Sequence, residues 1–537
     1  MKKFLTVLMT LVLIFSLCSA AFADTVLTIN DDGVERVYDA FQLLKLTTSL
    51  KGDDHHPATC DGTNHADDCY NYAYTVNEKY RDYLQKETFA HGGNYLWAGV
   101  TKPTAAAGVT DEKILEYLAN QTGDNGTNTL RQVADRLYRA IKAEDVTADK
   151  SRITSTGDII AEGYWMIVDV TDLNGENEAN SLAMVDTRGQ NSITVKPKTA
   201  LPTVEKKVKD IDDSEQSSIV SNPWQDSADH DIGDTVPFKL TGTLPSNVQS
   251  YQSYKLVFHD ELSAGLTLDP LSIRVLMYDT KYRADVDIDM NDGEDVTGSF
   301  TKTIAGLNDG CSFEVGCEDV FTIEGVTKDT AFVVYYEATL NENAVIGSAG
   351  NPNEVYLEFS NNPYDESTGE TEKDKVIVFT YQLVINKTDS HDHPLAGAGF
   401  TLSKKKIDGT YVVIGSELKG DDMTTFSWTG LDDGDYKLEE TTVPEGYNKM
   451  ADIVFSISAV HSENDNEPVL NSLDGGQMGT GVVDTGTITN TVVNNTGTVL
   501  PETGAKGTMM IIGCSAMVVI LAAVVMITRK KMSVYED

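Results

Sequence analysis

The chain has 537 residues and a formal net charge of −41, from 83 acidic and 42 basic side chains. No run of basic residues is longer than three, so the composition argues against a protein that binds nucleic acid. A hydrophobic fraction of 40% excludes wholesale disorder, and the length is enough for about three extracellular domains.

The first 23 residues have the pattern of an export signal. Lys2 and Lys3 precede an apolar stretch at 4–17, and Ala21-Phe22-Ala23 offers small residues for cleavage. We therefore expect residues 1–23 to be removed and the mature, exported chain to begin at Asp24.

Residues 24–200 show mixed patterns, which predict an α+β domain that is mostly strand with a helical insert. Thr110 is expected to begin a helix that ends at Gly123, and Asn128 is expected to begin a second helix. Alternating apolar residues predict strands over 163–170 and 192–195.

Residues 201–378 contain no convincing helical pattern. Alternating apolar runs, separated by turn-rich stretches, predict a β-sandwich with strands at 236–240, 254–258, 331–340 and 355–359. Residues 379–495 repeat this pattern on a smaller scale, from Tyr381 to Asn490. The expected fold is mainly β, with tandem immunoglobulin-like sandwiches after the α+β domain.

The C-terminal segment, 496–537, has three parts in a fixed order. Leu500-Pro501-Glu502-Thr503-Gly504 is followed by an apolar run at 509–528 and then by Arg529-Lys530-Lys531. The apolar run is long enough to cross a bilayer as a helix, and the cations after it favour the cytoplasmic side. A plain membrane anchor with a chance pentapeptide is the alternative interpretation.

Two close cysteine pairs lie between the export signal and the apolar C-terminal run. Because closely spaced cysteines in an exported chain are typical of local disulfides, we expect Cys60–Cys69 and Cys311–Cys317 to be bonded. The remaining two cysteines, Cys18 and Cys514, lie in the segments expected to leave the mature protein.

Two segments suggest metal binding, but neither matches a regular site. Cys60 and Cys69 lie near three histidines, yet their spacing fits no zinc finger. The acidic run 285–293 departs from EF-hand spacing at Gly293, so a solvated loop is expected instead of a calcium site. We therefore expect no metal and no cofactor.

Three polar side chains of the third segment fall on apolar strand faces: Lys387, Glu440 and Asn490. The simple alternative is that Lys387 reaches solvent at a strand end. If all three are buried together, burial favours a neutral amine and a protonated carboxyl. The amine can then attack the carboxamide while the acid moves protons, which releases ammonia and leaves a Lys–Asn isopeptide bond.

Residues 436–447, Tyr-Lys-Leu-Glu-Glu-Thr-Thr-Val-Pro-Glu-Gly-Tyr, resemble the E-box of Gram-positive pilins. With Lys387 early and Asn490 late, residues 379–495 resemble a Cna protein B-type domain. The resemblance implies Lys387 as the nucleophile, Asn490 as the acceptor and Glu440 as the assisting acid.

Residues 201–378 resemble the second domain of the same pilins, through their opening strand, 254–267 and 353–363. Alternation turns Lys206, and not Lys207, toward the interior, and likewise Asp260, and not Glu261. The resemblance then implies Lys206 as the nucleophile and Asp260 as the acid. Asn353 is the favoured acceptor and Asn361 the alternative.

Two further motifs resemble the assembly signals of backbone pilins. The pentapeptide 500–504 resembles the LPxTG sorting signal, which a sortase cleaves between Thr503 and Gly504 before transferring the Thr carbonyl to an amine. Lys198, after Pro197 at the domain boundary, resembles the polymerisation lysine of a pilin motif whose tyrosine is here replaced by Lys196. Lys196 is the second candidate, and an ordinary linker lysine is the alternative.

Together these resemblances imply a backbone subunit of a cell-surface pilus used in adhesion, not an enzyme with turnover. The implied partners are copies of itself in a head-to-tail polymer, pilin-specific and housekeeping sortases, tip and basal minor pilins, and peptidoglycan. The rival is a monomeric wall-anchored adhesin, which would need no reactive lysine. No catalytic arrangement supports a wall-bound hydrolase.

Overall fold

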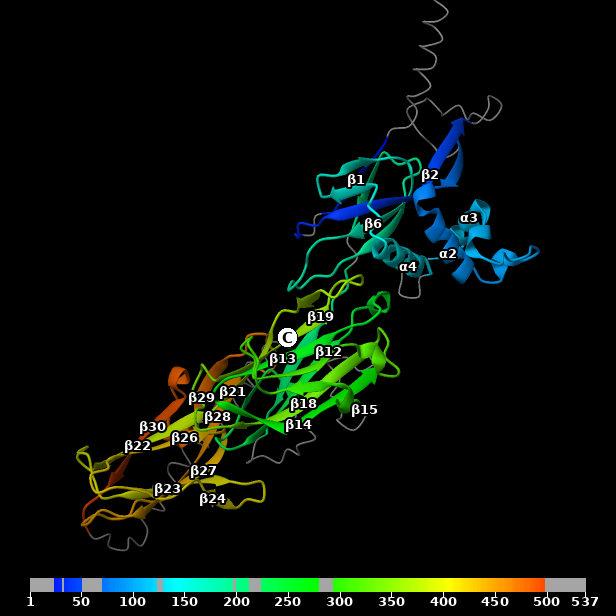
Figure 1. Cartoon of the computed structure of the whole chain (residues 1–537). Helices are drawn as coiled ribbons and strands as arrows, with labels where there is room; N and C mark the ends of the chain where they lie inside the picture. The colour runs from blue at the N-terminus through cyan, green and yellow to red at the C-terminus, as the bar shows by residue number, and fades with distance from the viewer. Residues whose placement is uncertain are drawn as a thin grey trace, which may run out of the picture.

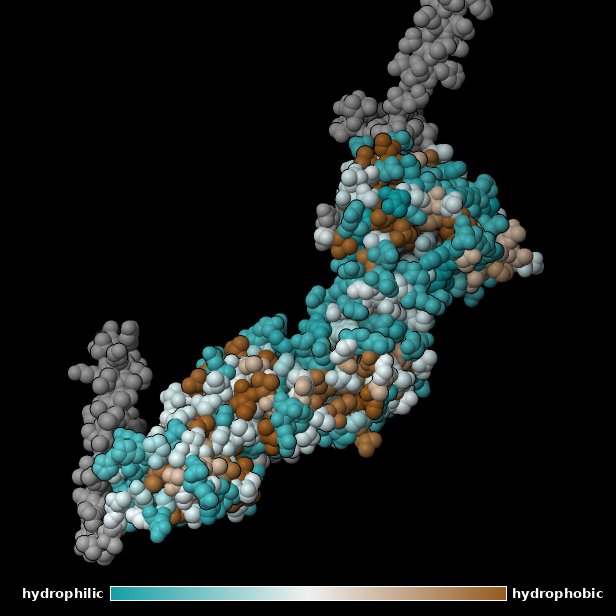
Figure 2. Space-filling view, turned by 60° about the vertical axis from the view of Figure 1, so that its left-hand side comes forward, coloured by the Kyte–Doolittle hydropathy of each residue, from teal (hydrophilic) through white to brown (hydrophobic). Residues whose placement is uncertain are grey.

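The computed structural model describes residues 24–30, 33–50, 70–122, 129–196, 199–211, 224–279 and 293–497. The fold is mainly β, with several sandwich domains and a small helical region. Figure 1 shows an elongated molecule in which N-terminal, central and C-terminal groups of strands follow one another. On the face in Figure 2, hydrophilic residues extend along the whole described length, with small hydrophobic patches between them.

Several predicted features lie outside the described residues: the export signal, Cys60 and Cys69, Lys198, most of the acidic run, the sorting signal and the apolar C-terminal run. Among the helices that are described, none combines the length and apolar character needed to span a bilayer.

The N-terminal domain combines two sheets with three α-helices. The smaller sheet has the order β5-β1-β8, and the larger has the order β3-β2-β6-β7 with β4 paired to β2. Their bounds are β1 (Thr25–Ile29), β2 (Tyr38–Leu50), β3 (Tyr70–Val76), β4 (Lys150–Ile153), β5 (Asp158–Ile160), β6 (Gly163–Asp169), β7 (Leu182–Asp186) and β8 (Ser192–Val195), with helices α2 (Arg81–His91), α3 (Asp111–Ala119) and α4 (Thr129–Ala143).

The helices follow from local sequence signals in two of three cases. Thr110 caps α3 as predicted, because its hydroxyl accepts from the backbone N–H of Lys113 at 3.4 Å. Helix α4 buries an apolar face that includes Leu137 and Ile141, as its periodicity predicts. Helix α2 was not predicted, because its buried side includes the charged residue Glu87, which interrupts the apolar pattern. In the structure the Glu87 carboxylate pairs with Arg136 of α4.

The central domain is a sandwich of two sheets around one large apolar core. The six-stranded sheet has the order β10-β9-β12-β18-β14-β15, and the seven-stranded sheet has the order β11-β21-β19-β13-β17-β16 with β20 on β19. The bounds are β9 (Val204–Lys209), β10 (Trp224–Gln225), β11 (Ser227–Asp229), β12 (Thr235–Thr243), β13 (Leu256–Leu262), β14 (Leu266–Asp279), β15 (Glu294–Asp295), β16 (Thr301–Thr303), β17 (Phe313–Cys317), β18 (Thr330–Leu340), β19 (Asn351–Ser360), β20 (Thr368–Glu370) and β21 (Asp374–Phe379). As predicted, the described residues of this domain form no α-helix.

The C-terminal domain is a smaller sandwich with its own core. Its sheets have the orders β26-β22-β30 and β24-β23-β27-β28-β29, with β25 on β23. The bounds are β22 (Tyr381–Asp389), β23 (Gly399–Lys405), β24 (Tyr411–Val413), β25 (Leu418–Lys419), β26 (Thr425–Leu431), β27 (Gly434–Thr442), β28 (Ile453–His461), β29 (Leu470–Asp474) and β30 (Thr487–Asn494). The first and last strands, β22 and β30, pair in parallel.

Polar contacts join the central domain to the C-terminal domain. Lys404 of β23 contacts Asp231 at 2.8 Å and Asp432 at 2.9 Å. Nδ1 of His461 lies 2.7 Å from the Ser227 hydroxyl, and its Nε2 faces two central-domain aspartates, Asp210 and Asp229, at 3.6 and 3.7 Å. The junction is therefore rich in buried charge.

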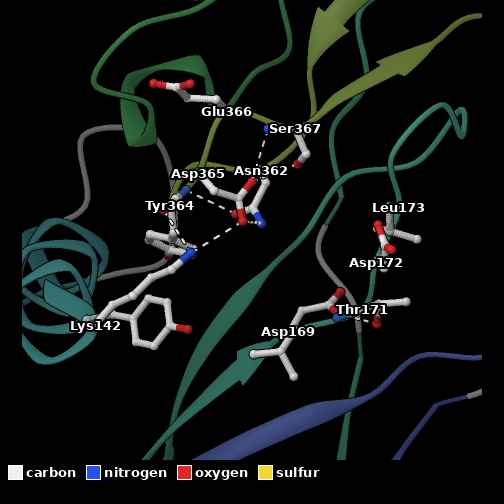
Figure 3. Close-up of a pocket in the computed structure, with 12 residues that line it drawn as sticks. Lys142, Asp169, Thr171, Asp172, Leu173, Asn362, Tyr364, Asp365, Glu366 and Ser367 are labelled. Carbon is white, nitrogen blue, oxygen red and sulfur yellow. Dashed lines mark hydrogen bonds and ion pairs between the residues drawn. The ribbon is translucent and has the colours of Figure 1, made fainter. Parts of the chain in front are cut away.

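A cavity of about 600 Å³ lies between the N-terminal and central domains (Figure 3). Lys142 of α4 reaches across it, donating to the Tyr364 carbonyl at 2.9 Å and contacting Asp365 at 3.3 Å. The Tyr364 hydroxyl donates to Asp135 of α4 at 2.7 Å. The loop after β19 thus ties the two domains together.

Candidate functional site

A lysine, an aspartate and an asparagine meet inside the central sandwich. Lys206 is fully buried, and its Nζ lies 2.5 Å from Asp260 Oδ2 and 2.5 Å from Asn353 Oδ1. Asp260 and Asn353 are also fully buried. The amine therefore contacts both the acid, Asp260, and the carboxamide, Asn353, that were predicted to react with it.

The two sheets bring these three side chains together. Lys206 lies on β9 of the six-stranded sheet, whereas Asp260 on β13 and Asn353 on β19 belong to the seven-stranded sheet. Strands β13 and β19 pair antiparallel, with Asp260 opposite Val355. Because alternate residues of a strand share a face, both side chains point toward β9 across the core.

Tyr336 of β18 completes the cluster. Its hydroxyl lies 3.0 Å from Asp260 Oδ2 and accepts a hydrogen bond from Asn353 Nδ2 at 2.7 Å. The aromatic rings of Tyr336 and Phe238 lie 5.6 and 5.8 Å from Lys206 Nζ. Tyr336 was not predicted as a site residue, although it lies two residues from buried Val334 and from buried Ala338 on the same face of β18.

Burial changes the protonation of the cluster. Desolvation lowers the pKa of Lys206 to about 8, although the nearby carboxyl of Asp260 opposes this shift. Desolvation also raises the pKa of Asp260, against the opposing charge of Lys206. Both shifts favour the neutral pair, a free amine beside a protonated carboxyl.

The alternative acceptor, Asn361, lies elsewhere. Its Nδ2 donates to the Leu173 carbonyl of the N-terminal domain at 2.6 Å, and its Oδ1 accepts from Ser367 at 2.9 Å. Asn361 therefore serves the contact between domains, whereas Asn353 contacts Lys206.

The C-terminal domain buries a second set of similar groups. Lys387 on β22 is 1% exposed, and its Nζ donates to the carbonyls of Thr388 at 2.8 Å and Val492 at 3.3 Å. Glu440 on β27 is fully buried and accepts from Asn494 Nδ2 at 2.7 Å. Desolvation lowers the pKa of Lys387, while the charge of Glu440 acts in the opposite direction.

The structure corrects the expected acceptor of this domain. Asn490 is partly exposed and donates to the Gln477 carbonyl at 3.2 Å, away from Glu440. In the parallel pairing of β22 with β30, Asn490 lies level with Ile385, two residues before Lys387. The asparagine that contacts Glu440 is Asn494, which is 1% exposed and whose Oδ1 has no hydrogen-bond partner.

The expected disulfide between Cys311 and Cys317 is wrong, because both thiols are free. Cys317 is buried at the end of β17, opposite Leu256. Cys311 precedes the same strand and lies 4.0 Å from the Tyr356 hydroxyl. An extended strand rises about 3.3 Å per residue, so it carries the two Cα atoms beyond the roughly 7 Å limit of a disulfide.

Comparison with known proteins identifies relatives of the C-terminal domain and of the chain. Residues 381–467 match the SpaA family, a prealbumin-like fold domain. The trypsin-resistant surface T6 protein of Streptococcus pyogenes serotype M6 is 27% identical over a match that covers 48% of this chain and 46% of the relative. The match thus spans about half the length of that relative.

Solved pilin structures are also similar. The T6 backbone pilin of S. pyogenes serotype M6 matches at 16% identity and a TM-score of 0.49, covering 89% of this chain and 98% of the pilin. The major pilin BcpA of Bacillus cereus matches at 17% identity and a TM-score of 0.37, covering 66% and 93%. The expected resemblance is confirmed: the chain is similar to the major backbone pilins of Gram-positive bacteria, and residues 381–467 match the SpaA prealbumin-like fold domain.

Proposed function

We propose that this chain is the backbone subunit of a covalent Gram-positive pilus and that two of its domains form internal isopeptide bonds. The observation that carries the proposal is the buried contact of Lys206 with Asp260 and Asn353. Burying a lysine in a core is costly, and its position between an acid and a carboxamide favours reaction over simple packing.

In the central domain, the reaction joins Lys206 to Asn353. The neutral amine attacks Cγ of Asn353, and protonated Asp260 donates a hydrogen bond that polarises the carboxamide. The carboxyl then carries a proton from the amine to the departing nitrogen, so ammonia leaves as the amide bond forms. Tyr336 holds the carboxamide nitrogen and the carboxyl in place. Fixed proximity in the core makes a cofactor unnecessary.

In the C-terminal domain, we infer a bond from Lys387 to Asn494, with Glu440 as the assisting acid. Asn494 Nδ2 already donates to Glu440, which places the acid at the nitrogen that leaves as ammonia. Lys387 Nζ must turn from the Val492 carbonyl toward Cγ of Asn494, two residues further along β30.

Polymerisation uses one group near the C-terminus and one in the connection between the N-terminal and central domains. A pilin sortase cleaves after Thr503 and transfers the Thr carbonyl to Lys198 of another copy, with Lys196 as the second candidate. Strand β8 ends at Val195 and β9 begins at Val204, so both lysines belong to the connection between two domains. A housekeeping sortase then attaches the polymer to peptidoglycan at the cell surface, where minor pilins cap it and adhesion takes place.

The test is an SDS gel of boiled wall extracts probed for this chain. A ladder of multimers that disappears with Lys198→Ala or Lys196→Ala supports the pilus subunit. A single band from the unaltered chain contradicts it and favours a monomeric wall-anchored adhesin.

A further inference from the structure

A group of metal-binding side chains lies on the outer face of the seven-stranded sheet, away from the Lys206 cluster. The ligand atoms of His259, Asp309 and Cys311 all lie within 4.8 Å of one another. His259 Nδ1 is 2.8 Å from Asp309 Oδ2 and 3.6 Å from Glu314 Oε1. The isopeptide chemistry uses none of these residues.

We propose that His259 Nδ1, Cys311 Sγ and the carboxylates of Asp309 and Glu314 bind one zinc-class divalent cation. Imidazole, thiolate and carboxylate are the ligands that Zn²⁺ takes in proteins, and a thiolate argues against Ca²⁺ or Mg²⁺. Ligands about 2.1 Å from a tetrahedral ion lie roughly 3.4 Å apart. To reach that spacing, the 2.8 Å contact between His259 and Asp309 has to open, and the pairs that lie up to 4.8 Å apart have to close. Glu314 Oε1 is already 3.6 Å from His259 Nδ1.

The other side of the imidazole supports this assignment independently. His259 is 8% exposed, and its Nε2 is buried without a hydrogen-bond partner. This nitrogen faces Glu358 Oε2 at 3.6 Å, and Lys255 holds the same oxygen at 2.8 Å. Metal-binding histidines usually donate their second N–H to a carboxylate, which fixes the ring and its tautomer. Glu358 is the carboxylate that faces this nitrogen here, and a small approach would complete the hydrogen bond.

The sheet holds the site in place. His259 lies on β13, Glu358 on β19 and Glu314 on β17, three neighbouring strands. The ring of Tyr356 stacks on His259 with centroids 4.6 Å apart and 9° between planes. Only Asp309 and Cys311 come from a loop, and the bound ion would fasten this loop to the sheet. The ligand role also accounts for a free, partly exposed thiol in an exported chain.

The test uses the mature chain, reduced and stripped of metal, titrated with Co²⁺ as a spectroscopic probe. We expect one equivalent to give a thiolate-to-cobalt absorption band that Zn²⁺ removes, and Zn²⁺ alone to raise the thermal midpoint. Cys311→Ser should abolish the band, and the matched control Cys317→Ser should retain it. Glu358→Gln should weaken Co²⁺ binding about 10- to 100-fold while retaining the band.

The second cysteine pair provides the competing outcome. If the band persists in Cys311→Ser and disappears in a Cys60→Ser/Cys69→Ser variant, the metal binds at the other pair and the proposal is wrong. If millimolar Co²⁺ gives no thiolate band in the unaltered chain, the cluster is an ion-pair network only. If the band is lost in Cys311→Ser and retained in Cys317→Ser and in Cys60→Ser/Cys69→Ser, the site is supported, even if one of these variants is less stable than the unaltered chain.

Discussion

Replacing Asn353 with alanine tests the isopeptide reaction in the central domain most directly. Asn353→Ala removes the carboxamide that Lys206 contacts at 2.5 Å and leaves Asp260 in place. The amine then has no acceptor, so the bond cannot form. The mass deficit of the chain should fall from about 34 Da, two molecules of ammonia, to about 17 Da.

The expected loss of stability follows from the length of chain that the bond closes. Lys206 and Asn353 are 147 residues apart, and closing a loop of that size removes about 5 kcal/mol of entropy from the unfolded chain in the loop-closure treatment used for disulfides. For a domain of this size, about 5 kcal/mol corresponds to roughly 10–20 °C in the thermal midpoint. Losing the buried hydrogen bond to Tyr336 adds about 1–3 kcal/mol.

Intact-mass spectrometry under reducing conditions and calorimetry measure the two effects. Asn361→Ala is the matched control, because Asn361 is equally buried but contacts Leu173 and Ser367. It should keep the full mass deficit and lose only the stability of the domain contact. An unchanged deficit in Asn353→Ala, or a halved deficit in Asn361→Ala, would refute the assignment.

Three further predictions concern the other sites. Asn494→Ala should lose one ammonia-sized mass deficit, whereas Asn490→Ala should keep it; the reverse pattern would restore the sequence-based acceptor. Burial lowers the pKa of His461, but the nearby carboxylates of Asp210 and Asp229 outweigh this effect and raise the pKa to about 10. Because this pKa lies above the ordinary 6.5 of histidine, the stabilisation that protonated His461 provides is complete below about pH 6.5 and is lost as pH rises through 10. The urea midpoint of unfolding should therefore fall across this pH range, and it should fall less in His461→Gln. Lys198→Ala should abolish the multimer ladder while the monomer stays folded and wall-attached, and Lys196→Ala should leave the ladder intact; a ladder in Lys198→Ala would contradict the choice of lysine.

Strand alternation predicted much of the central site. A period of two assigns each residue of a strand to one face, which was enough to choose Lys206 over Lys207 and Asp260 over Glu261. Both chosen side chains are fully buried in the structure, whereas Lys207 reaches Asp226 outside the core and Glu261 is exposed.

The same reasoning could not choose between residues that share a face. Asn490 and Asn494 both lie on the face of Ile488, so alternation treats them alike. Their difference comes from the register of β30 beside β22, which places Val492 level with Lys387. Register depends on contacts between distant segments and not on the local pattern.

The prediction of a disulfide between Cys311 and Cys317 failed for a different reason. Close spacing along the chain suggested a local loop between Cys311 and Cys317, but residues 313–317 form an extended strand. Helix α2 was missed because its buried side includes Glu87, which looks solvent-exposed in sequence until Arg136 and Tyr117 are seen beside it. In both cases the deciding partner lies far away in the sequence: β13 pairs with the strand that holds Cys317, and Arg136 pairs with Glu87.

The proposed polymer also gives a physical reason for the positions of Lys206 and Lys387. If each subunit is pulled between Lys198 and Thr503, the tension passes through the central and C-terminal sandwiches and bypasses the N-terminal domain. Lys206 lies on the first strand of the central domain, and Lys387 lies on the first strand of the C-terminal domain. A covalent bond at these positions carries load that would otherwise fall on the hydrogen bonds of β9 and β22. Among the described residues up to 196, no lysine is buried, as expected for a domain outside the path of the load.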